Sequence, residues 1–136
     1  MEFNIKPLSE TDYDEILVGW WKAWKWTPPL KDFLPENGTG GIMVLDNDIP
    51  VCAGFVYMTN SKVSWVDYIV SSRSYSKKPQ RQKALDLLIK TLTKICKDSG
   101  SKFSYALIKN KSLIKTYEKL GYQAADNYSQ EMIKLL

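Results

Sequence analysis

The sequence contains no histidine among its 136 residues. Histidine is the side chain that most often changes charge near neutral pH, and it is the commonest protein ligand of metal ions. Its absence excludes Ser-His-Asp and Cys-His catalysis outright. Cys52 and Cys96 are the only cysteines and lie far apart, so we expect no zinc site and no other metal. A general base must therefore come from another residue type, such as a carboxylate.

Long apolar runs and cysteine motifs are also missing. No apolar run approaches the roughly 20 residues of a membrane-spanning helix, so no membrane partner is expected. Cys52 and Cys96 lack CxxC spacing and lie in apolar stretches, which predicts reduced core residues. Residues 1–8 lack the pattern of a signal peptide, so we expect a cytoplasmic protein. The length and the 44% content of hydrophobic residues suit one domain over residues 1–136.

The formal net charge is +4, and much of the positive charge lies between Arg73 and Lys90. A local basic cluster suits an anionic ligand, such as the phosphates of a cofactor or a nucleic acid. A solvated surface is the alternative interpretation.

Apolar spacing and turn residues predict the order β-α-α-β-β-β-α-β-α-β-β. The expected strands cover 3–7, 42–45, 51–58, 63–70 and 103–108, with two more in 122–136 around the turn-like Asp126-Asn127. The expected helices cover 12–24, a short turn at 30–34, 84–98 and 112–120, with Gly100 and Gly121 as stop signals. An antiparallel meander followed by strand–helix–strand–helix indicates an α/β fold: a mixed sheet with helices on both faces.

The stretch from Asn110 to Tyr122 ends in Tyr117-Glu-Lys-Leu-Gly-Tyr122. With the element order, this motif resembles the GCN5-related N-acetyltransferases, over the whole chain. The resemblance implies an acyltransferase that uses acetyl-CoA as co-substrate and acetylates a primary amine. It also implies that Tyr117 protonates the departing thiolate and that Asn110 contacts the pantetheine arm of the cofactor. From the residues alone, Tyr117 equally fits a core aromatic and Asn110 a helix cap.

One part of the family pattern is altered. Family members open the long central helix with Arg/Gln-x-x-Gly-x-Gly/Ala, whose backbone N–H groups bind the pyrophosphate. Here Pro79 to Ala84 aligns with that turn: Ala84 is acceptable, but Gln82 replaces the central glycine and Pro79 the first residue. Two interpretations remain open. Either the domain has lost the cofactor, or basic side chains, with Gln82 and Ala84 still in the turn, bind the phosphates: Lys77, Lys78, Arg81 and Lys83.

Asp67 is the candidate general base. It lies in the middle of the strand predicted at 63–70, an unusual place for a charge unless one face is open. A carboxylate acting through water could accept the proton of the acceptor amine. The alternative is a solvent-facing or salt-bridged aspartate. The resemblance implies that this strand lines the cofactor cleft, with the backbone of Ile69 and Val70 against pantetheine.

Tryptophans are concentrated near the N-terminus. The spacing of Trp20, Trp21 and Trp24 is typical of a helix face in the core, whereas Trp26 follows the helix and is expected to be exposed. The resemblance places this region in one wall of the acceptor pocket. We therefore predict that Trp24 and Trp26 bind the acceptor, where an aromatic face suits an amine.

Three functions follow from these observations. The first is an acetyl-CoA-dependent N-acetyltransferase that acts on a primary amine of a small molecule or a protein. The second is a non-catalytic domain of the same fold that binds a protein partner through its tryptophan-rich face. The third, nucleic-acid binding by Arg73 to Lys90, is the weakest because only Tyr75 offers a stacking platform there. The final strands, if exposed, could also pair two copies into a homodimer.

Overall fold

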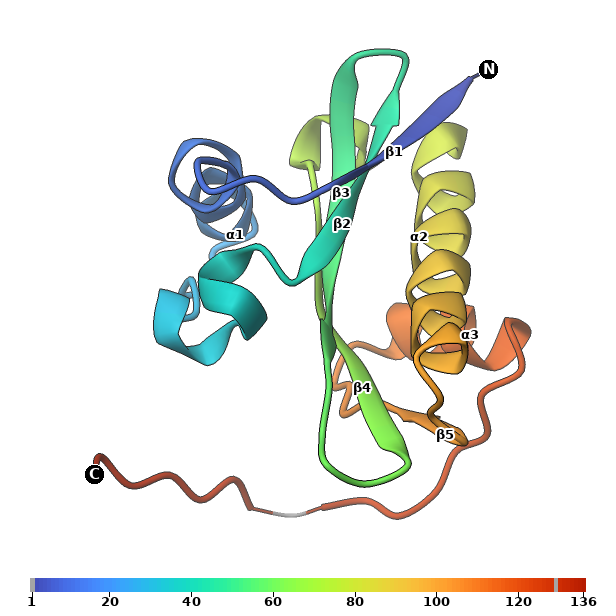
Figure 1. The fold of residues 1–136 in the computed structure, drawn as a ribbon. Helices are drawn as coiled ribbons and strands as arrows, with labels where there is room; N and C mark the ends of the chain where they lie inside the picture. Colours follow the sequence, from blue (N-terminus) through green and yellow to red (C-terminus); the bar gives the residue numbers. More distant parts are fainter. Residues whose placement is uncertain (1, 129) are drawn as a thin grey trace.

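The computed structural model describes residues 2–128 and 130–136, and a five-stranded sheet in the order β1-β2-β3-β4-β5 forms its centre (Figure 1). The first four strands pair antiparallel in chain order, and the fifth pairs parallel with β4. This mixed sheet confirms the predicted fold class. The strands are β1 Phe3–Pro7, β2 Gly41–Asp46, β3 Ile49–Tyr57, β4 Val63–Ser71 and β5 Phe103–Tyr105.

Helices cover both faces of the sheet, as the element order predicted. Figure 1 shows α1 (Val18–Ala23), preceded by a π-helical turn over Tyr13–Leu17, on one side. The helices α2 (Pro79–Asp98) and α3 (Lys111–Lys119) lie on the other side. A hydrophobic core fills each interface, one around Leu88 of α2 and one around Trp21 of α1. In the described part of the chain, no helix is both long enough and apolar enough to cross a bilayer.

The predicted glycine stop signals end both long helices. Gly100 follows α2 with φ 96 and Gly121 follows α3 with φ 101, a left-handed conformation that glycine adopts without strain. The Ser101 N–H donates to the Cys96 carbonyl and so closes the last turn of α2. Cys96 and Cys52 are buried and free, as predicted.

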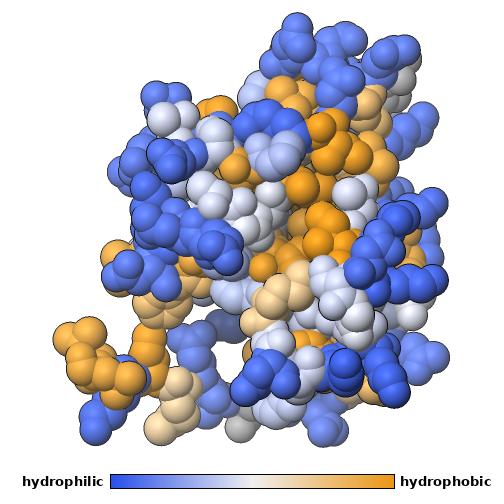
Figure 2. Space-filling view, in the orientation of Figure 1, coloured by the Kyte–Doolittle hydropathy of each residue, from blue (hydrophilic) through white to orange (hydrophobic). Residues whose placement is uncertain are grey.

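The last part of the predicted element order is wrong. The fifth strand ends at Tyr105 instead of residue 108, and no strand is assigned in 123–128 or 130–136. The described tail runs beneath the sheet, and its apolar end stands apart from the body at the lower left (Figure 2). An alternating pattern becomes a strand only when a neighbour supplies a hydrogen-bonded ladder, and here none does. Four side chains at this end are 70% or more exposed: Met132, Ile133, Leu135 and Leu136.

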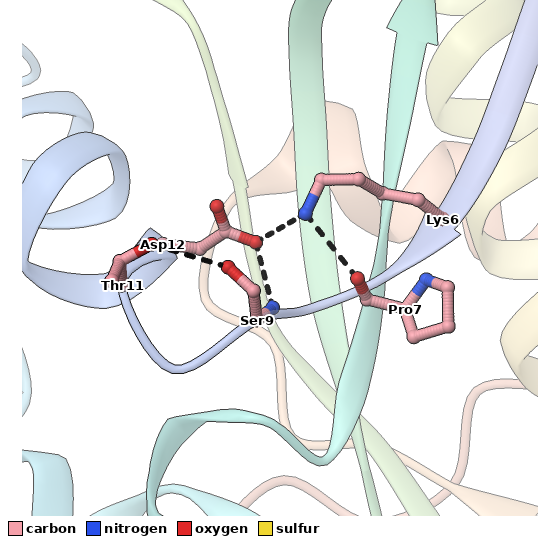
Figure 3. Close-up of polar contacts among 5 residues, drawn as sticks. All are labelled: Lys6, Pro7, Ser9, Thr11 and Asp12. Carbon is pink, nitrogen blue, oxygen red and sulfur yellow. Dashed lines mark hydrogen bonds and ion pairs between the residues drawn. The ribbon is translucent and has the colours of Figure 1, made fainter.

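A buried carboxylate fixes the connection from β1 to the first helical turn (Figure 3). Asp12 is only 5% exposed, and its carboxylate accepts hydrogen bonds from Lys6 Nζ at 2.5 Å and from the Ser9 N–H at 2.8 Å. Burial alone would raise the pKa of Asp12, but these two donors outweigh it and lower the pKa below its ordinary value. The carboxylate of Asp12 thus satisfies a backbone N–H that precedes the first helical turn.

Asp12→Ala should lower the free energy of unfolding at neutral pH by about 1–3 kcal/mol, because it leaves the Ser9 N–H and the Lys6 ammonium without their acceptor. Since the folded pKa lies below the unfolded one, the carboxylate stabilises the protein above about pH 4. That stabilisation disappears as the pH falls through the folded pKa. Urea unfolding should therefore show a gap between wild type and variant that narrows in acid.

Asp14→Ala is the matched control, since Asp14 is an exposed carboxylate whose contact with Lys31 is 3.6 Å long. It should cost no more than about 1 kcal/mol. The role given to Asp12 would be contradicted if the two variants lost equal free energies of unfolding. It would also be contradicted if the difference between wild type and Asp12→Ala did not change with pH.

Candidate active site

A bulge in β4 lies opposite Gly54 of β3. Two residues of β4, Tyr68 and Ile69, face this one glycine, and Tyr68 takes a φ of 54, which is unusual for an aromatic residue. A Cβ on Gly54 would lie 2.5 Å from Ile69 Cδ1 and 2.9 Å from Leu92 Cδ1. A side chain here would therefore displace the ends of Ile69 and Leu92, whereas glycine lets both pack directly over β3.

A cleft opens where β4 and β5 diverge. The two strands share only three residue pairs, the last being Trp65 with Tyr105. Beyond that pair, a cavity of about 50 Å³ lies between β4 and the first turns of α2 and α3. Its lining comprises Ile69, Val70 and Ser71 of β4, Arg81 and Leu85 of α2, Asn110, Ser112, Leu113 and Thr116 at the start of α3, and Trp26.

The carboxylate of Asp67 connects β4 to the residues after β5, at the point where the two strands separate. It accepts a hydrogen bond from the Leu107 N–H at 3.1 Å, just beyond the end of β5, and a longer one of 3.3 Å from the Tyr68 N–H. Burial raises the pKa of Asp67, and the two N–H donors reverse this shift only in part. The site therefore holds a half-buried carboxylate whose affinity for a proton is above the ordinary value.

Tyr117 lies under the same part of β4. Its side chain is 2% exposed, its hydroxyl donates to the Val66 carbonyl at 2.8 Å, and its ring packs edge-on against Tyr122 with centroids 4.9 Å apart. Burial and then the negative charge of Asp67 raise the pKa of Tyr117. The phenol is therefore protonated throughout the neutral range. Its neighbour along the sequence motif, Tyr122, is part of the packing that holds it.

The first turn of α2 offers few backbone donors to an anion. Pro79 has no N–H, the Lys78 N–H donates to the Tyr75 carbonyl, and the Arg81 N–H donates to the Lys78 carbonyl. Pro79 and the Arg81 N–H are therefore lost as backbone donors to an anion at this helix start.

Gln82, at the position of the family's central glycine, connects two helices. Its Nε2 donates to Asp86 Oδ1 at 2.9 Å and to Thr116 Oγ1 of α3 at 3.0 Å. Gln82 therefore joins α2 to α3 through hydrogen bonds and does not line the cleft.

Arg81 supplies a positive charge inside the cleft. Its Nε donates to Ser71 Oγ at 3.1 Å, and its guanidinium lies 5.5 Å from the ring centroid of Trp24. Burial lowers the pKa of Arg81, but the ordinary value is so high that the group stays charged. Within the described residues, no carboxylate forms an ion pair with it.

The other predicted phosphate ligands lie elsewhere. Lys78 Nζ packs over the Tyr75 ring at 4.6 Å, Lys83 is exposed, and Ala84 is fully buried in the core. Of the predicted cofactor residues, the structure therefore brings Arg81 together with Ile69, Val70 and Asn110.

Asn110 fits both interpretations that the sequence left open. Its Oδ1 accepts the Leu113 N–H at 3.0 Å, so it is the N-cap of α3. The residue also lines the cleft.

Trp24 and Trp26 form a stacked pair beside the cleft. Their ring centroids are 5.6 Å apart with an interplanar angle of 18°, and Trp24 Nε1 donates to the Ser71 carbonyl at 2.7 Å. Arg73 packs on the Trp24 ring at 4.9 Å. Sequence patterns missed Ser71 and Arg73, because a serine that ends a strand and an arginine in a basic stretch carry no signal of what they contact in space.

Neither a protein-family model nor a curated protein matches this sequence. Solved structures do match over nearly the whole chain. An acetyltransferase from Trypanosoma brucei has 18% identity and a TM-score of 0.68, covering 97% of this chain and 100% of that one. Glucosamine-6-phosphate N-acetyltransferase from Arabidopsis thaliana has 14% identity and a TM-score of 0.61, with 99% of each chain covered.

A third similar structure is AAC(6')-Iy in complex with the bisubstrate analogue CoA-S-monomethyl-acetylneamine. It has 10% identity and a TM-score of 0.69, covering 99% of this chain and 100% of that one. Identities this low establish the fold alone. The fold is that of the GCN5-related N-acetyltransferases, as the resemblance of the sequence predicted.

Asp67→Asn should leave the free energy of unfolding at neutral pH equal to that of wild type or higher, because the amide oxygen still accepts the Leu107 N–H while the buried charge is gone. The raised folded pKa of Asp67 means that the carboxylate costs stability above it. The free energy of unfolding of wild type should therefore increase relative to that of the variant as the pH falls through that pKa. Urea unfolding at neutral and mildly acid pH measures the difference.

Asp67→Ala is the matched comparison, since it leaves the Leu107 N–H without an acceptor and should cost about 1–3 kcal/mol at neutral pH. A large loss of stability in Asp67→Asn as well would show that the charge itself holds the strands together.

Proposed function

We propose that this protein transfers the acetyl group of acetyl-CoA to a primary amine. The observation that carries the proposal is the cleft at the divergence of β4 and β5, which is lined by the guanidinium of Arg81, a group with no ion-pair partner among the described residues. Two perturbed groups lie next to its lining: Asp67, two residues before Ile69 on β4, has a raised pKa, and the buried phenol of Tyr117 donates to the Val66 carbonyl of the same strand. Perturbed groups that converge on a cleft are typical of active sites.

The charges and backbone groups around the cleft suit the chemistry of an extended ligand with phosphates at one end. Arg81 would hold a phosphate by charge-assisted hydrogen bonds, in place of the backbone donors that Pro79 and the Arg81 N–H cannot offer. Exposed Lys77, Lys78 and Lys83 nearby add positive charge that attracts an anion to this end. The backbone of Ile69 and Val70 borders the middle of the cleft, where an amide-containing arm would lie.

The chemical step would be direct. The neutral amine attacks the thioester carbonyl carbon, a C–N bond forms, the C–S bond breaks, and the sulfur leaves as a thiolate. Backbone N–H groups of β4 would stabilise the oxyanion. Asp67, through a water molecule, would take the proton that the amine loses, and its raised pKa makes it a stronger base than an exposed aspartate.

Tyr117 would supply a proton to the thiolate. Its raised pKa keeps the phenol protonated at neutral pH, as an acid requires. The same shift makes the transfer to a thiolate less favourable, so the role depends on close approach of the sulfur to the hydroxyl. The acetyltransferases among the similar structures support the reaction class, and the complex of AAC(6')-Iy with a CoA conjugate supports the co-substrate.

Arg81→Gln should weaken acetyl-CoA binding at least tenfold, because a charge-assisted hydrogen bond to phosphate is worth about 1.5–3 kcal/mol. Isothermal titration calorimetry measures it. Lys90→Gln is the control, because it removes the same charge from an exposed position farther along α2 and should change the affinity less than twofold. Failure of wild type to bind millimolar acetyl-CoA would refute the proposed function.

Tyr117→Phe should lower kcat by at least tenfold while leaving the dissociation constant of acetyl-CoA within twofold of wild type. Asp67→Asn should flatten the rise of kcat/KM with pH that titration of a single base produces. Acetylation of a panel of primary amines, followed as thiol release, provides the measurement. An unchanged kcat in Tyr117→Phe would remove that residue from the chemistry.

A second candidate function is favoured by one observation. Trp26, Leu30 and Phe33 are exposed by 45%, 66% and 43% and lie close together in the chain after α1. Exposed apolar side chains of this kind could bind a protein partner without catalysis. Cytoplasmic location also stays a prediction. So does the homodimer, but the final strands on which it was based are not present in residues 123–128 and 130–136.

A further inference from the structure

The cleft is too small for the ligand proposed for it. Its volume is about 50 Å³, whereas sites for ligands of this size usually measure about 300–1,000 Å³. Some side chain must leave before an acyl-CoA thioester can enter.

Trp26 is the lining residue that can move. The others belong to β4, α2 or the start of α3, which the sheet ladder and the core around Leu88 hold in place. Trp26 alone among them comes from the segment between α1 and β2, and its side chain packs into neither hydrophobic core. It is 45% exposed, and residues 25–30 around it form no helix or strand. Trp26 therefore covers the cleft without being fixed by its own packing.

Contacts of Trp24 hold this cover closed. Its Nε1 donates to the Ser71 carbonyl at 2.7 Å, its ring stacks on Trp26, and the guanidinium groups of Arg73 and Arg81 lie 4.9 and 5.5 Å from its centroid. Lys25 makes the turn between the two tryptophans with a φ of 63, a conformation that costs a residue with a side chain some strain. The closed arrangement thus uses polar groups at the cleft, the Ser71 carbonyl and the Arg81 guanidinium.

We propose that the stacked side chains of Trp24 and Trp26 form a lid, which closes the cleft in the free protein and swings out when an acyl-CoA thioester binds, while the backbone stays tethered by the bonds from the Trp26 N–H to the Trp21 carbonyl and from the Tyr13 hydroxyl to the Pro29 carbonyl. The proposal rests on the proposed function and adds a gate to it. Opening frees the Ser71 carbonyl for the amide groups of the ligand. A phosphate on Arg81 competes with the Trp24 ring for the guanidinium, so ligand binding and lid opening favour each other.

The lid lowers the apparent affinity in proportion to the fraction of molecules that are open. Removing the cover should therefore raise affinity, although it deletes a large aromatic side chain from the edge of the site. A residue that simply contacted the ligand would show the opposite effect. This difference in sign separates a lid from an ordinary binding residue.

The test is acetyl-CoA binding to wild type and to Trp26→Ala, Trp24→Phe and Leu30→Ala, by calorimetry and by stopped-flow tryptophan fluorescence. Trp26→Ala should bind at least fivefold more tightly, through faster association. Trp24→Phe keeps the aromatic face but loses the donor to Ser71, so its affinity should also rise. Leu30→Ala is the control, because Leu30 is exposed on the same segment and does not line the cleft. Circular dichroism checks that each variant is folded.

Wild type should also show an association rate that reaches a plateau at high acetyl-CoA, set by lid opening, and Trp26→Ala should lose the plateau. Wild-type binding with equal or weaker binding in both tryptophan variants would overturn the lid and leave the proposed function standing. Absence of binding at millimolar acetyl-CoA in wild type would refute the proposed function and the lid with it.

Discussion

The structure of the site depends on one local constraint, the bulge in β4 opposite Gly54. Two residues of β4 occupy the length of one residue of β3, and Gly54 leaves the ends of Ile69 and Leu92 free to pack at that point. Bulges bend a strand and redirect its side chains. Here β4 leaves β5 after three residue pairs, and the cleft opens directly beyond them. Asp67 and the hydroxyl of Tyr117 both bond to backbone at this divergence.

The altered turn before α2 has a physical explanation in the rest of the site. A glycine-rich turn binds phosphate through backbone N–H groups, and in this chain the proline at 79 and the local hydrogen bond of the Arg81 N–H remove two of those donors. Gln82, in place of the glycine, joins α2 to α3 through Thr116. The positive charge of the cleft is instead a side chain, Arg81, without a carboxylate partner in the part of the chain that is described. The cleft thus has a side-chain charge at the place where the family pattern has a backbone cradle.

Much of the fold could be predicted because its signals are local. The apolar stripes and terminal glycines of α2 and α3 predicted both helices, and the turns after 45 and 58 predicted the meander. The bulge could not be predicted, since nothing in the sequence around Tyr68 indicates a left-handed aromatic residue; the ladder with β3 and the glycine on it decide that conformation. The final strands were predicted from alternation alone, which is insufficient without a neighbouring edge.

The site was predicted less completely, because part of it depends on contacts between residues far apart in the sequence. Motif and pattern named Arg81 and Asn110, which line the cleft, and Asp67 and Tyr117, which lie next to it. The place of Trp24 and Trp26 at the cleft depends instead on contacts across 47 residues of sequence, from Trp24 to Ser71.

Backbone amide shifts during a titration with acetyl-CoA test the central claim most directly. If the divergence of β4 and β5 is the cofactor site, nuclear magnetic resonance should show the largest changes at the amides of Ile69, Val70 and Ser71 and at the indole N–H of Trp24. Changes confined to other surfaces, or none at millimolar acetyl-CoA, would contradict the account.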